Sequence, residues 1–284
     1  MYIAPYRAGA VEAGRTKRLP FILRLPALAQ GRALLLLPES LPESSSPQAV
    51  LPAEFFLPGK ATGVFAAGTI LLSAGEPFFA VTLRLELPMR GRRHSLPCIR
   101  LLSLRDIPGG EMSFSACRNG MALAWITVSD RGAAGERRDE SGPAVEDMVR
   151  AALPLRCASG YLIPDDLFRL RSLVADLALV QGYDLIISSG GTGISGRDLT
   201  PEALLPLLEK RLPGFEQAML LASLQKTPHG AISRAICGVV GESILLTLPG
   251  SPKAVRENLL PLLPALPHAL DKLQGSAADC GTSD

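Results

Sequence analysis

The stretch ISSGGTGISGRDLTPE, residues 187–202, decides how the second half of this 284-residue chain is expected to fold. It completes an apolar run over residues 184–189 that predicts a strand, and three glycines follow at positions 191, 193 and 196. Gly191-x-Gly193-x-x-Gly196 has the spacing of a dinucleotide-binding fingerprint, and Gly191 and Gly196 have the spacing of a P-loop. The stretch therefore allows three interpretations: a nicotinamide site, an altered ATP loop, or another kind of phosphate-binding loop.

The residues after the glycines argue against the first two interpretations. A dinucleotide fingerprint needs its helix to begin among the glycines, but the strongest helix start is Thr200-Pro201-Glu202, beyond Gly196. A P-loop needs Lys-Ser/Thr where this chain has Arg197-Asp198. The Asp198 carboxylate would repel a pyrophosphate unless a cation lay between them. We therefore interpret the loop as a glycine cradle for phosphates, with Asp198 directed at Mg²⁺.

An alternation of strands and helices surrounds this loop. Apolar runs at 122–129, 155–164 and 184–189 predict strands, and residues 232–250 predict a hairpin that turns at Gly241-Glu242. Capping residues and apolar stripes predict four helices. These run from 141 to about 153, from 165 or 166 to at least 177, from 200 to about 212, and from 251 to about 274. The expected fold class is α/β, a three-layer sandwich with a mostly parallel sheet over residues 119–274.

The first 118 residues have a different pattern. Short apolar runs are separated by Pro, Gly and Ser clusters, and sustained helical periodicity is absent. Residues 79–87 alternate, which places Val81, Leu83, Leu85 and Leu87 on one face of an expected half-buried strand. We predict a small β-rich N-terminal domain of unknown function over residues 1–118, and a disordered tail over residues 275–284.

Composition and charge exclude several classes of protein. Hydrophobic residues make up 47% of the chain and charged residues 20%, which argues against disorder. The first 120 residues carry 14 Lys and Arg against 8 Asp and Glu, but they lack the interleaved aromatic residues of a nucleic-acid site. Five cysteines without a C-x-x-C pair argue against disulfides and zinc. With no apparent signal peptide or membrane span, we expect a cytoplasmic protein without nucleic-acid or membrane partners.

Two further loops repeat the combination of glycines and polar side chains. The loop at 127–142 follows the first expected strand of the sheet and holds Ser129, Asp130, Asp139 and Ser141. The loop at 247–258 places Gly250-Ser251 at a helix N-terminus, where Lys253 adds a positive charge. Because the carboxyl ends of parallel strands meet at one edge of a sheet, these loops predict a site for a phosphate-bearing small molecule. His229 is interpreted as a structural loop residue.

Several motifs stand in order along residues 120–273. They are SDR at 129–131, DESGPAV at 139–145, IPDD at 163–166, GGTGISGRDLTPEA at 190–203, PGFEQAM at 213–219, ISRAICG at 232–238 and LPGSPKAV at 248–255. Together they resemble the molybdopterin adenylyltransferase family of the MogA/MoaB type, whose domain is also found fused in gephyrin. The most specific part is GGTG-x-x-x-RD-x-TPE with a downstream LPG-x-P. Residues 1–118 lie outside the resemblance.

The resemblance implies an enzyme of molybdenum cofactor biosynthesis. Family members bind Mg²⁺ and ATP with molybdopterin as substrate, move AMP onto the terminal phosphate of the pterin, and release pyrophosphate. The product then goes to a molybdate-inserting partner, and the family commonly forms trimers. The alternative is a non-catalytic module that stores or delivers molybdopterin. The presence of both family aspartates, Asp165 and Asp198, counts against that alternative.

The resemblance also implies particular site residues. Asp165 and Asp198 match the two aspartates that the family uses for catalysis and for Mg²⁺. The segment Gly190, Gly191, Thr192 and Gly193 would cradle phosphate through backbone N–H groups. The other implied contacts to pterin or nucleotide are Ser129, Asp130, Asp139, Ser141, Gly142, Thr200, Glu202, Ser233, Pro249, Gly250, Ser251 and Lys253.

Overall fold

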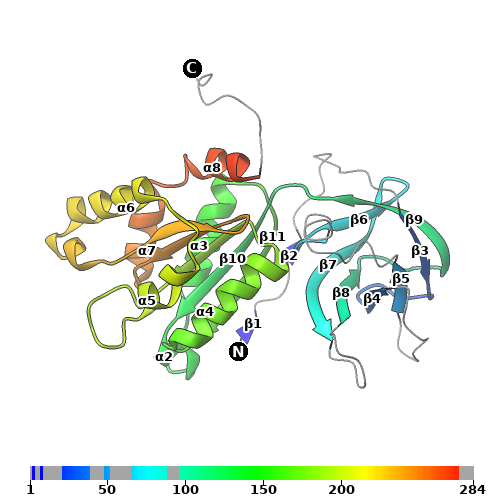
Figure 1. The fold of residues 1–284 in the computed structure, drawn as a ribbon, viewed down its shortest axis with the longest axis horizontal. Coiled ribbons are helices and arrows are strands. Elements are labelled where there is room, and N and C mark those ends of the chain that lie inside the picture. Colours follow the sequence, from blue (N-terminus) through cyan, green and yellow to red (C-terminus); the bar gives the residue numbers. More distant parts are fainter. Residues whose placement is uncertain are drawn as a thin grey trace, which may run out of the picture.

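The structure is a computed structural model that describes residues 2–3, 7–8, 21–38, 48–51, 65–87 and 96–274. These residues form two sheets. One is a mixed sheet with helices on both faces, and the other is a curled, mostly antiparallel sheet without helices (Figure 1). The β-rich character expected of the N-terminal part is confirmed.

The helix-covered sheet has a parallel centre. Its four central strands run in the order β11 (Leu155–Ile163), β10 (Met121–Val128), β12 (Leu185–Ser189) and β15 (Ser243–Leu248), all parallel. Antiparallel strands flank this centre: β14 (Cys237–Val240) and β13 (Lys210–Arg211) on the β15 side, β1 (Tyr2–Ile3) and β2 (Arg7–Ala8) on β11. The prediction of a mostly parallel sheet is confirmed, as is the hairpin, in which β14 and β15 pair across Gly241.

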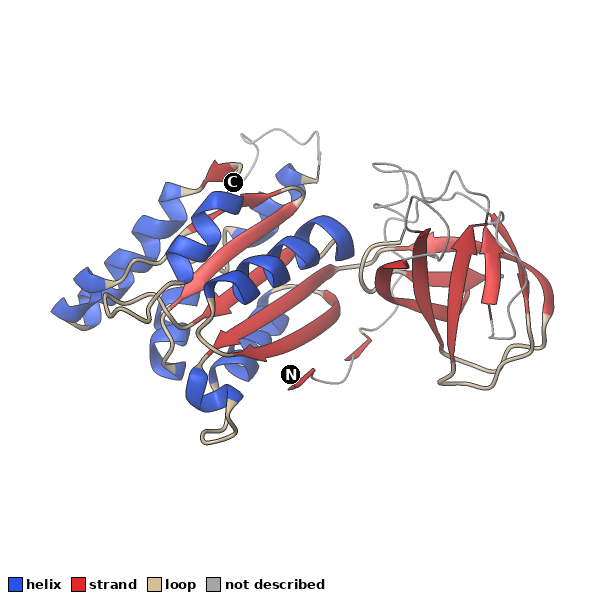
Figure 2. Cartoon of the chain, turned by 60° about the horizontal axis from the view of Figure 1, so that its bottom comes forward, coloured by secondary structure: helices blue, strands red, loops and turns tan. Residues whose placement is uncertain are grey.

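Helices cover both faces of this sheet, as Figure 2 shows. One face packs against α3 (Ser141–Ala152), α6 (Pro213–Lys226), α7 (Pro252–Leu259) and α8 (Leu266–Leu273). The other face packs against α4 (Leu167–Ala175), its π-helical continuation η2 (Asp176–Gln181) and α5 (Thr200–Leu204). β10 shows why both faces need cover, since Leu123 enters one core and Ile126 the other. The three-layer sandwich is confirmed.

Prolines explain where the helices depart from expectation. The helix predicted from 200 to about 212 ends at Leu204, because Pro206 follows in the 3-10 turn η3 (Leu205–Leu207). The helix predicted from 251 to about 274 is broken between α7 and α8, where Pro261 and Pro264 lie. The helix α6 was not predicted. It carries exposed Leu221 as well as buried Met219, so it lacks a single apolar stripe.

The second sheet curls around its own apolar core. Its strand order is β3 (Phe21–Leu25), β9 (Gly110–Cys117), β6 (Ile70–Ser73), β7 (Glu76–Leu87), β8 (Leu96–Ser103), β4 (Ala33–Pro38) and β5 (Gln48–Leu51). Among the described strands of this sheet, only β4 and β5 pair in parallel. Phe65, Phe79 and Phe114 fill the core. A bulge at Thr82 interrupts the alternation expected along β7, so Val81 is buried whereas Leu83 is half-buried.

The two sheets meet at the amino ends of the parallel strands. The Ala67 N–H donates to the Gln181 carbonyl (2.8 Å), and Arg156 Nε donates to the Ala67 carbonyl (2.8 Å). Arg156 also forms a buried ion pair with Asp184 at 2.8 Å. The curled sheet is therefore attached at the edge opposite to the carboxyl-end loops.

The chain passes between the sheets over a short connection. β9 ends at Cys117 and β10 begins at Met121, close to the predicted boundary at 118/119. The strands β1 and β2 nevertheless pair with β11 of the other sheet. The division into two domains stays a prediction, and the predicted disordered tail lies outside the described residues. In the part of the chain that the structure describes, no helix is long and apolar enough to cross a bilayer.

Candidate functional site

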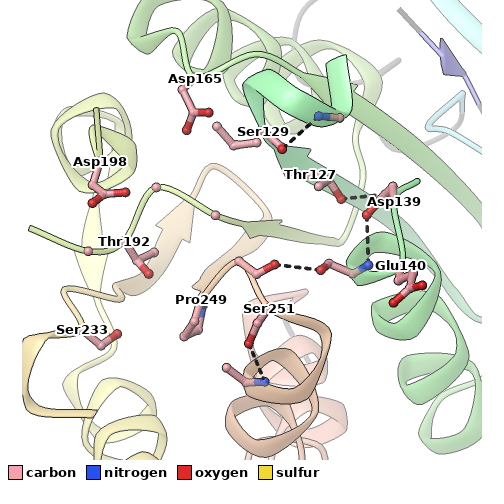
Figure 3. Close-up of a pocket in the computed structure, with 18 of the residues that line it drawn as sticks. Thr127, Ser129, Asp139, Glu140, Asp165, Thr192, Asp198, Ser233, Pro249 and Ser251 are labelled. Atoms are coloured by element: carbon pink, nitrogen blue, oxygen red, sulfur yellow. Dashed lines mark hydrogen bonds between the residues drawn. The ribbon is translucent and has the colours of Figure 1, made fainter. Parts of the chain in front are cut away.

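A cavity of about 530 Å³ opens at the carboxyl ends of the parallel strands. Its walls are the loops after β10, β11, β12 and β15, together with the 3-10 turn η4 (Pro228–Ile232). Figure 3 shows Asp165 and Asp198 on one side of it and Pro249 and Ser251 on another. Three loops that were predicted to share a ligand therefore do line one space.

Most of the sequence-predicted site residues line this cavity. They are Ser129, Asp139, Ser141, Asp165, Gly190, Gly191, Thr192, Gly193, Asp198, Ser233, Pro249, Gly250 and Ser251. The residues that the structure does not place in its lining are Asp130, Gly142, Thr200, Glu202 and Lys253. The first four of these five support the site from behind, as the contacts below show, whereas Lys253 is exposed on α7.

The glycine loop, residues 190–199, leaves three backbone donors for a ligand. Gly190 has a φ of +104°, and a Cβ there would lie 2.3 Å from the Val128 carbonyl oxygen. Its N–H donates to the Leu248 carbonyl (3.0 Å), so it serves the turn and not an anion. Within the described residues, the N–H groups of Gly191, Thr192 and Gly193 have no acceptor. Successive free amides of this kind form an anion-binding concavity.

Thr200 holds the end of the glycine loop against its beginning. Its Oγ1 donates to the Gly190 carbonyl (2.8 Å), and its N–H donates to the Gly191 carbonyl (3.1 Å). The side chain is buried, and a Cβ on Gly191 would lie 2.5 Å from Oγ1. Thr200 therefore shapes the loop, and it begins α5 without capping it.

Asp198 and Asp165 bring two carboxylates to the same side of the cavity. Asp198 Oδ2 accepts from the Ser195 N–H (2.8 Å). Asp166, not Asp165, caps α4 by accepting from the Arg169 N–H (2.7 Å), which leaves Asp165 to face the cavity. Burial raises the pKa of the Asp165 carboxyl above its usual value, and the negative charges of Asp130 and Asp198 raise it as well. The two carboxylates thus stand in each other's field, as a cation site requires.

Asp139 lines the cavity, but its carboxylate oxygens already accept hydrogen bonds from other residues of the protein. Its Oδ1 accepts from the N–H groups of Ser141 (3.0 Å) and Gly142 (3.2 Å), and its Oδ2 accepts from Thr127 Oγ1 (2.9 Å). These bonds fix the start of α3. Ser141 Oγ in turn donates to the Gly250 carbonyl (2.9 Å), which ties the loop after β10 to the loop after β15.

The sequence comparisons identify the helix-covered region. The model of the probable molybdopterin binding domain matches residues 124–268, just over half of the chain. The chain belongs to this family. Among its relatives, the molybdopterin adenylyltransferase of Helicobacter pylori J99 is 32% identical over 152 residues, which cover 53% of this chain and 86% of that protein. Gephyrin of Dictyostelium discoideum is 40% identical over 154 residues, or 51% of this chain, but this chain spans only 21% of gephyrin.

Solved structures agree with the family. The molybdopterin biosynthesis enzyme MoaB from Thermus thermophilus is 40% identical, with a TM-score of 0.51 over 55% of this chain and 98% of that one. The Mog protein from Mycobacterium ulcerans is 35% identical, with a TM-score of 0.51 over 54% of this chain and 99% of that one. The resemblance drawn from the motifs is therefore confirmed, and the matched part of the chain is the molybdopterin-binding domain.

Sequence reasoning missed several cavity residues of the molybdopterin-binding domain. Arg137 and Arg138 line it from the loop after β10, and neither forms an ion pair within the described part of the chain. Two adjacent arginines in a glycine-bounded loop are a signal that could have found them. His229, interpreted as structural, also lines the cavity, and nothing in its sequence context indicated this. Ser233, which the sequence did predict, has a buried Oγ without a hydrogen-bond partner in the described structure.

Proposed function

We propose that this chain is a molybdopterin adenylyltransferase, which transfers AMP from ATP to the terminal phosphate of molybdopterin and releases pyrophosphate. One observation carries the proposal. Two carboxylates, Asp165 and Asp198, line the same cavity as the three free amides of residues 191–193. Phosphate binding and cation binding are then available side by side, which is what a phosphate-transfer site needs.

The cavity offers suitable contacts to two anionic substrates. The amides of residues 191–193 can receive phosphate oxygens. Arg137 and Arg138 supply guanidinium groups, which match phosphate geometry. The buried Ser233 hydroxyl can hydrogen-bond a polar edge of the pterin or its phosphate. These groups would bind the phosphates and the pterin, whereas the aspartates would bind the cation.

The donor set fits Mg²⁺. Both Asp165 and Asp198 offer hard carboxylate oxygens, and Mg²⁺ is usually held by one or two carboxylates, waters and substrate phosphates. The raised pKa of Asp165 reflects burial and negative neighbours, a field that a divalent cation would relieve. The described residues contain no cluster of three or more candidate metal-binding side chains, so a fully protein-ligated metal is not indicated there. When bound, Mg²⁺ would be held by Asp165 and Asp198 and would screen the negative charge of the phosphates.

The proposed reaction needs little acid–base chemistry from the protein. A terminal phosphate oxygen of molybdopterin attacks the α-phosphorus of ATP, a new P–O bond forms, and the bond to the β-phosphate breaks. Pyrophosphate leaves with the electron pair. Because the nucleophile is already an anion, the chain's own groups act by holding both phosphates in line and by stabilising the charge.

The wider setting is also proposed. The product would pass to a molybdate-inserting partner, and the chain would act as a homotrimer, as the family resemblance implies. A reducing compartment such as the cytoplasm suits Cys98, Cys117, Cys157 and Cys237, which are buried free thiols. Size-exclusion chromatography with light scattering tests the trimer directly.

Pyrophosphate release tests the activity. We expect release from ATP only when both Mg²⁺ and molybdopterin are present, and we expect Asp198→Asn to reduce it by at least about 10²-fold, the scale of losing a charge-stabilising group. Asp147→Asn, at an exposed position of α3, is the matched control and should leave the rate unchanged. Tight molybdopterin binding without any ATP consumption would instead support the non-catalytic delivery module.

A further inference from the structure

Arg234 hydrogen-bonds three backbone carbonyls of the glycine loop, although it does not line the cavity. Its own N–H donates to the Thr192 carbonyl (2.9 Å). Its side chain donates from Nε to the Gly193 carbonyl (2.8 Å) and from Nη2 to the Asp198 carbonyl (2.6 Å), and Nη1 bonds the Glu202 carboxylate. One residue therefore holds the carbonyls on both sides of the turn that carries Asp198.

These contacts bear on the free amides. In a planar trans peptide, the C=O of one residue and the N–H of the next point in opposite directions. The Arg234 backbone N–H fixes the Thr192 carbonyl, so the Gly193 N–H of that peptide points away from Arg234. The guanidinium fixes the next carbonyl in the loop, that of Gly193. Packing restrains this part of the loop little, since Ile194, Ser195 and Gly196 are exposed. Without the guanidinium, two of the carbonyls would lose their protein donor.

The same contacts hold Asp198. Its carbonyl is bound by Arg234 while its carboxylate accepts from Ser195, so the residue is restrained at both ends. A Cβ at Gly193 would lie 2.7 Å from Asp198 Oδ2, which shows how closely the two sides of the turn approach. A shift of the Gly193 carbonyl would therefore move the carboxylate too.

The contact with Glu202 orients the guanidinium more than it stabilises the fold. Both side chains are partly exposed, at 36% for Arg234 and 45% for Glu202, and exposed ion pairs contribute little free energy. The bond lowers the pKa of Glu202, which stays ionised and keeps its partner in place. Arginine is needed because its planar fork offers several donors in fixed directions, whereas lysine offers a single ammonium group.

We propose that Arg234 is a positioning residue, which sets the glycine loop so that the amides of residues 191–193 and the Asp198 carboxylate are directed together for adenylyl transfer. The inference rests on the proposed function. Ser233, its neighbour in the chain, lines the same cavity, so the loop geometry and the ligand-facing hydroxyl are coupled through one dipeptide.

Kinetics of variants test this role. We expect Arg234→Ala to lower kcat by about 10²-fold, the effect of misplacing reacting groups by about 1 Å, and to raise the Mg²⁺ concentration needed for half-maximal rate. The KM for molybdopterin should change less than about 3-fold, since Arg234 does not line the cavity. Guanidinium ion at millimolar concentration should restore at least about a tenth of the lost rate to Arg234→Ala, and Arg234→Lys should remain impaired. The Arg211→Ala variant, which removes an exposed arginine from another Arg–Glu pair, is the control.

A second measurement is independent of turnover. Amide hydrogen exchange over residues 190–199 of the substrate-free protein should be faster in Arg234→Ala than in the wild type, and unchanged in Arg211→Ala. Wild-type turnover with an equally active Arg234→Ala, or no guanidinium rescue together with unchanged exchange, overturns the positioning role and leaves the proposed function standing. A wild-type chain without turnover overturns the proposed function and the catalytic role of Arg234 together, whatever the exchange shows.

Discussion

Asp130 and Asp165 exchange hydrogen bonds: the Asp130 N–H donates to Asp165 Oδ2 (2.9 Å), and the Asp165 N–H donates to Asp130 Oδ1 (3.0 Å). This reciprocal pair joins the loop after β10 to the loop after β11. It also places a second negative charge beside the Asp165 carboxylate. Burial is the main cause of the raised pKa of Asp165, and the Asp130 charge raises it further. Asp130 thus acts on the site without lining the cavity.

The pair leads to a prediction on pH. A raised pKa means that Asp165 is protonated at a higher pH than an ordinary aspartate, so Mg²⁺-dependent activity falls as the pH falls through that pKa. Asp130→Asn keeps the Oδ1 acceptor but removes the charge, which lowers the pKa of Asp165. We expect the acid limb of the kcat/KM profile to move to lower pH in Asp130→Asn and to stay in place in Asp147→Asn. A move to higher pH would contradict this account.

The two arginines of the cavity give a prediction on binding. Arg137 and Arg138 line it without ion pairs in the described chain, so their charges are free for phosphate. We expect the double variant Arg137→Gln/Arg138→Gln to raise the KM of a phosphate-bearing substrate by about 10-fold or more, and to weaken its dependence on ionic strength. Lys210→Gln, at the far edge of the sheet, serves as the control. Unchanged KM values in the double variant would remove these arginines from the site.

Trp125 gives a prediction on stability. A Cβ added at Gly160 would lie 1.9 Å from its ring, and one added at Gly142 would lie 2.2 Å from it, so the indole is packed between two glycines. We expect Gly160→Ala to lower the free energy of unfolding by about 1–3 kcal/mol or more, because overpacking displaces the indole. Gly214→Ala on α6, where a Cβ meets nothing within 4 Å, should be neutral or stabilising. Urea titration of the two variants measures the difference, and equal midpoints would refute it.

The buried ion pair at the amino ends of the parallel strands gives a second prediction on stability. Asp184 accepts from the Ala122 N–H (2.7 Å) and pairs with Arg156 and Arg118. Removing one partner of a buried pair leaves the other charge uncompensated, so Asp184→Ala should cost about 3–5 kcal/mol of unfolding free energy. Glu76→Ala breaks the exposed pair with Arg105 and should cost less than about 1 kcal/mol. Chemical denaturation measures both losses of unfolding free energy. Similar losses in the two variants would show that the Asp184 ion pairs do not stabilise the fold more than an exposed pair does.

Local patterns predicted much of the fold. Continuous apolar runs predicted β10, β11 and β12, and the glycine at 241 predicted the turn of the hairpin. They did not predict the early end of α5, which depends on a proline in an apolar context. They also did not predict α6, because it has no single apolar face. Parallel topology then brought the loops together, since the strand ends share one edge.

The roles within the site were harder to predict, because they depend on contacts between distant positions. The sequence allowed either Asp165 or Asp166 to cap α4, and only the bond from the Arg169 N–H separates them. Gly190 was expected to donate to phosphate, but its N–H meets the Leu248 carbonyl across the sheet. Arg234 lies more than thirty residues along the chain from the loop that it holds, and no spacing rule connects them. The assignment of ligand contacts to individual residues stays a prediction.

Transfer of label from ATP tests the central claim most directly. The purified chain is incubated with Mg²⁺, molybdopterin and ATP labelled with ³²P at the α-phosphate, and the pterin fraction is separated and identified by mass spectrometry. The account predicts that the α-label moves to the pterin as an AMP adduct, and that γ-labelled ATP gives labelled pyrophosphate only. Label that stays on ATP while molybdopterin binds tightly, or that reaches the pterin from the γ-phosphate, would contradict it.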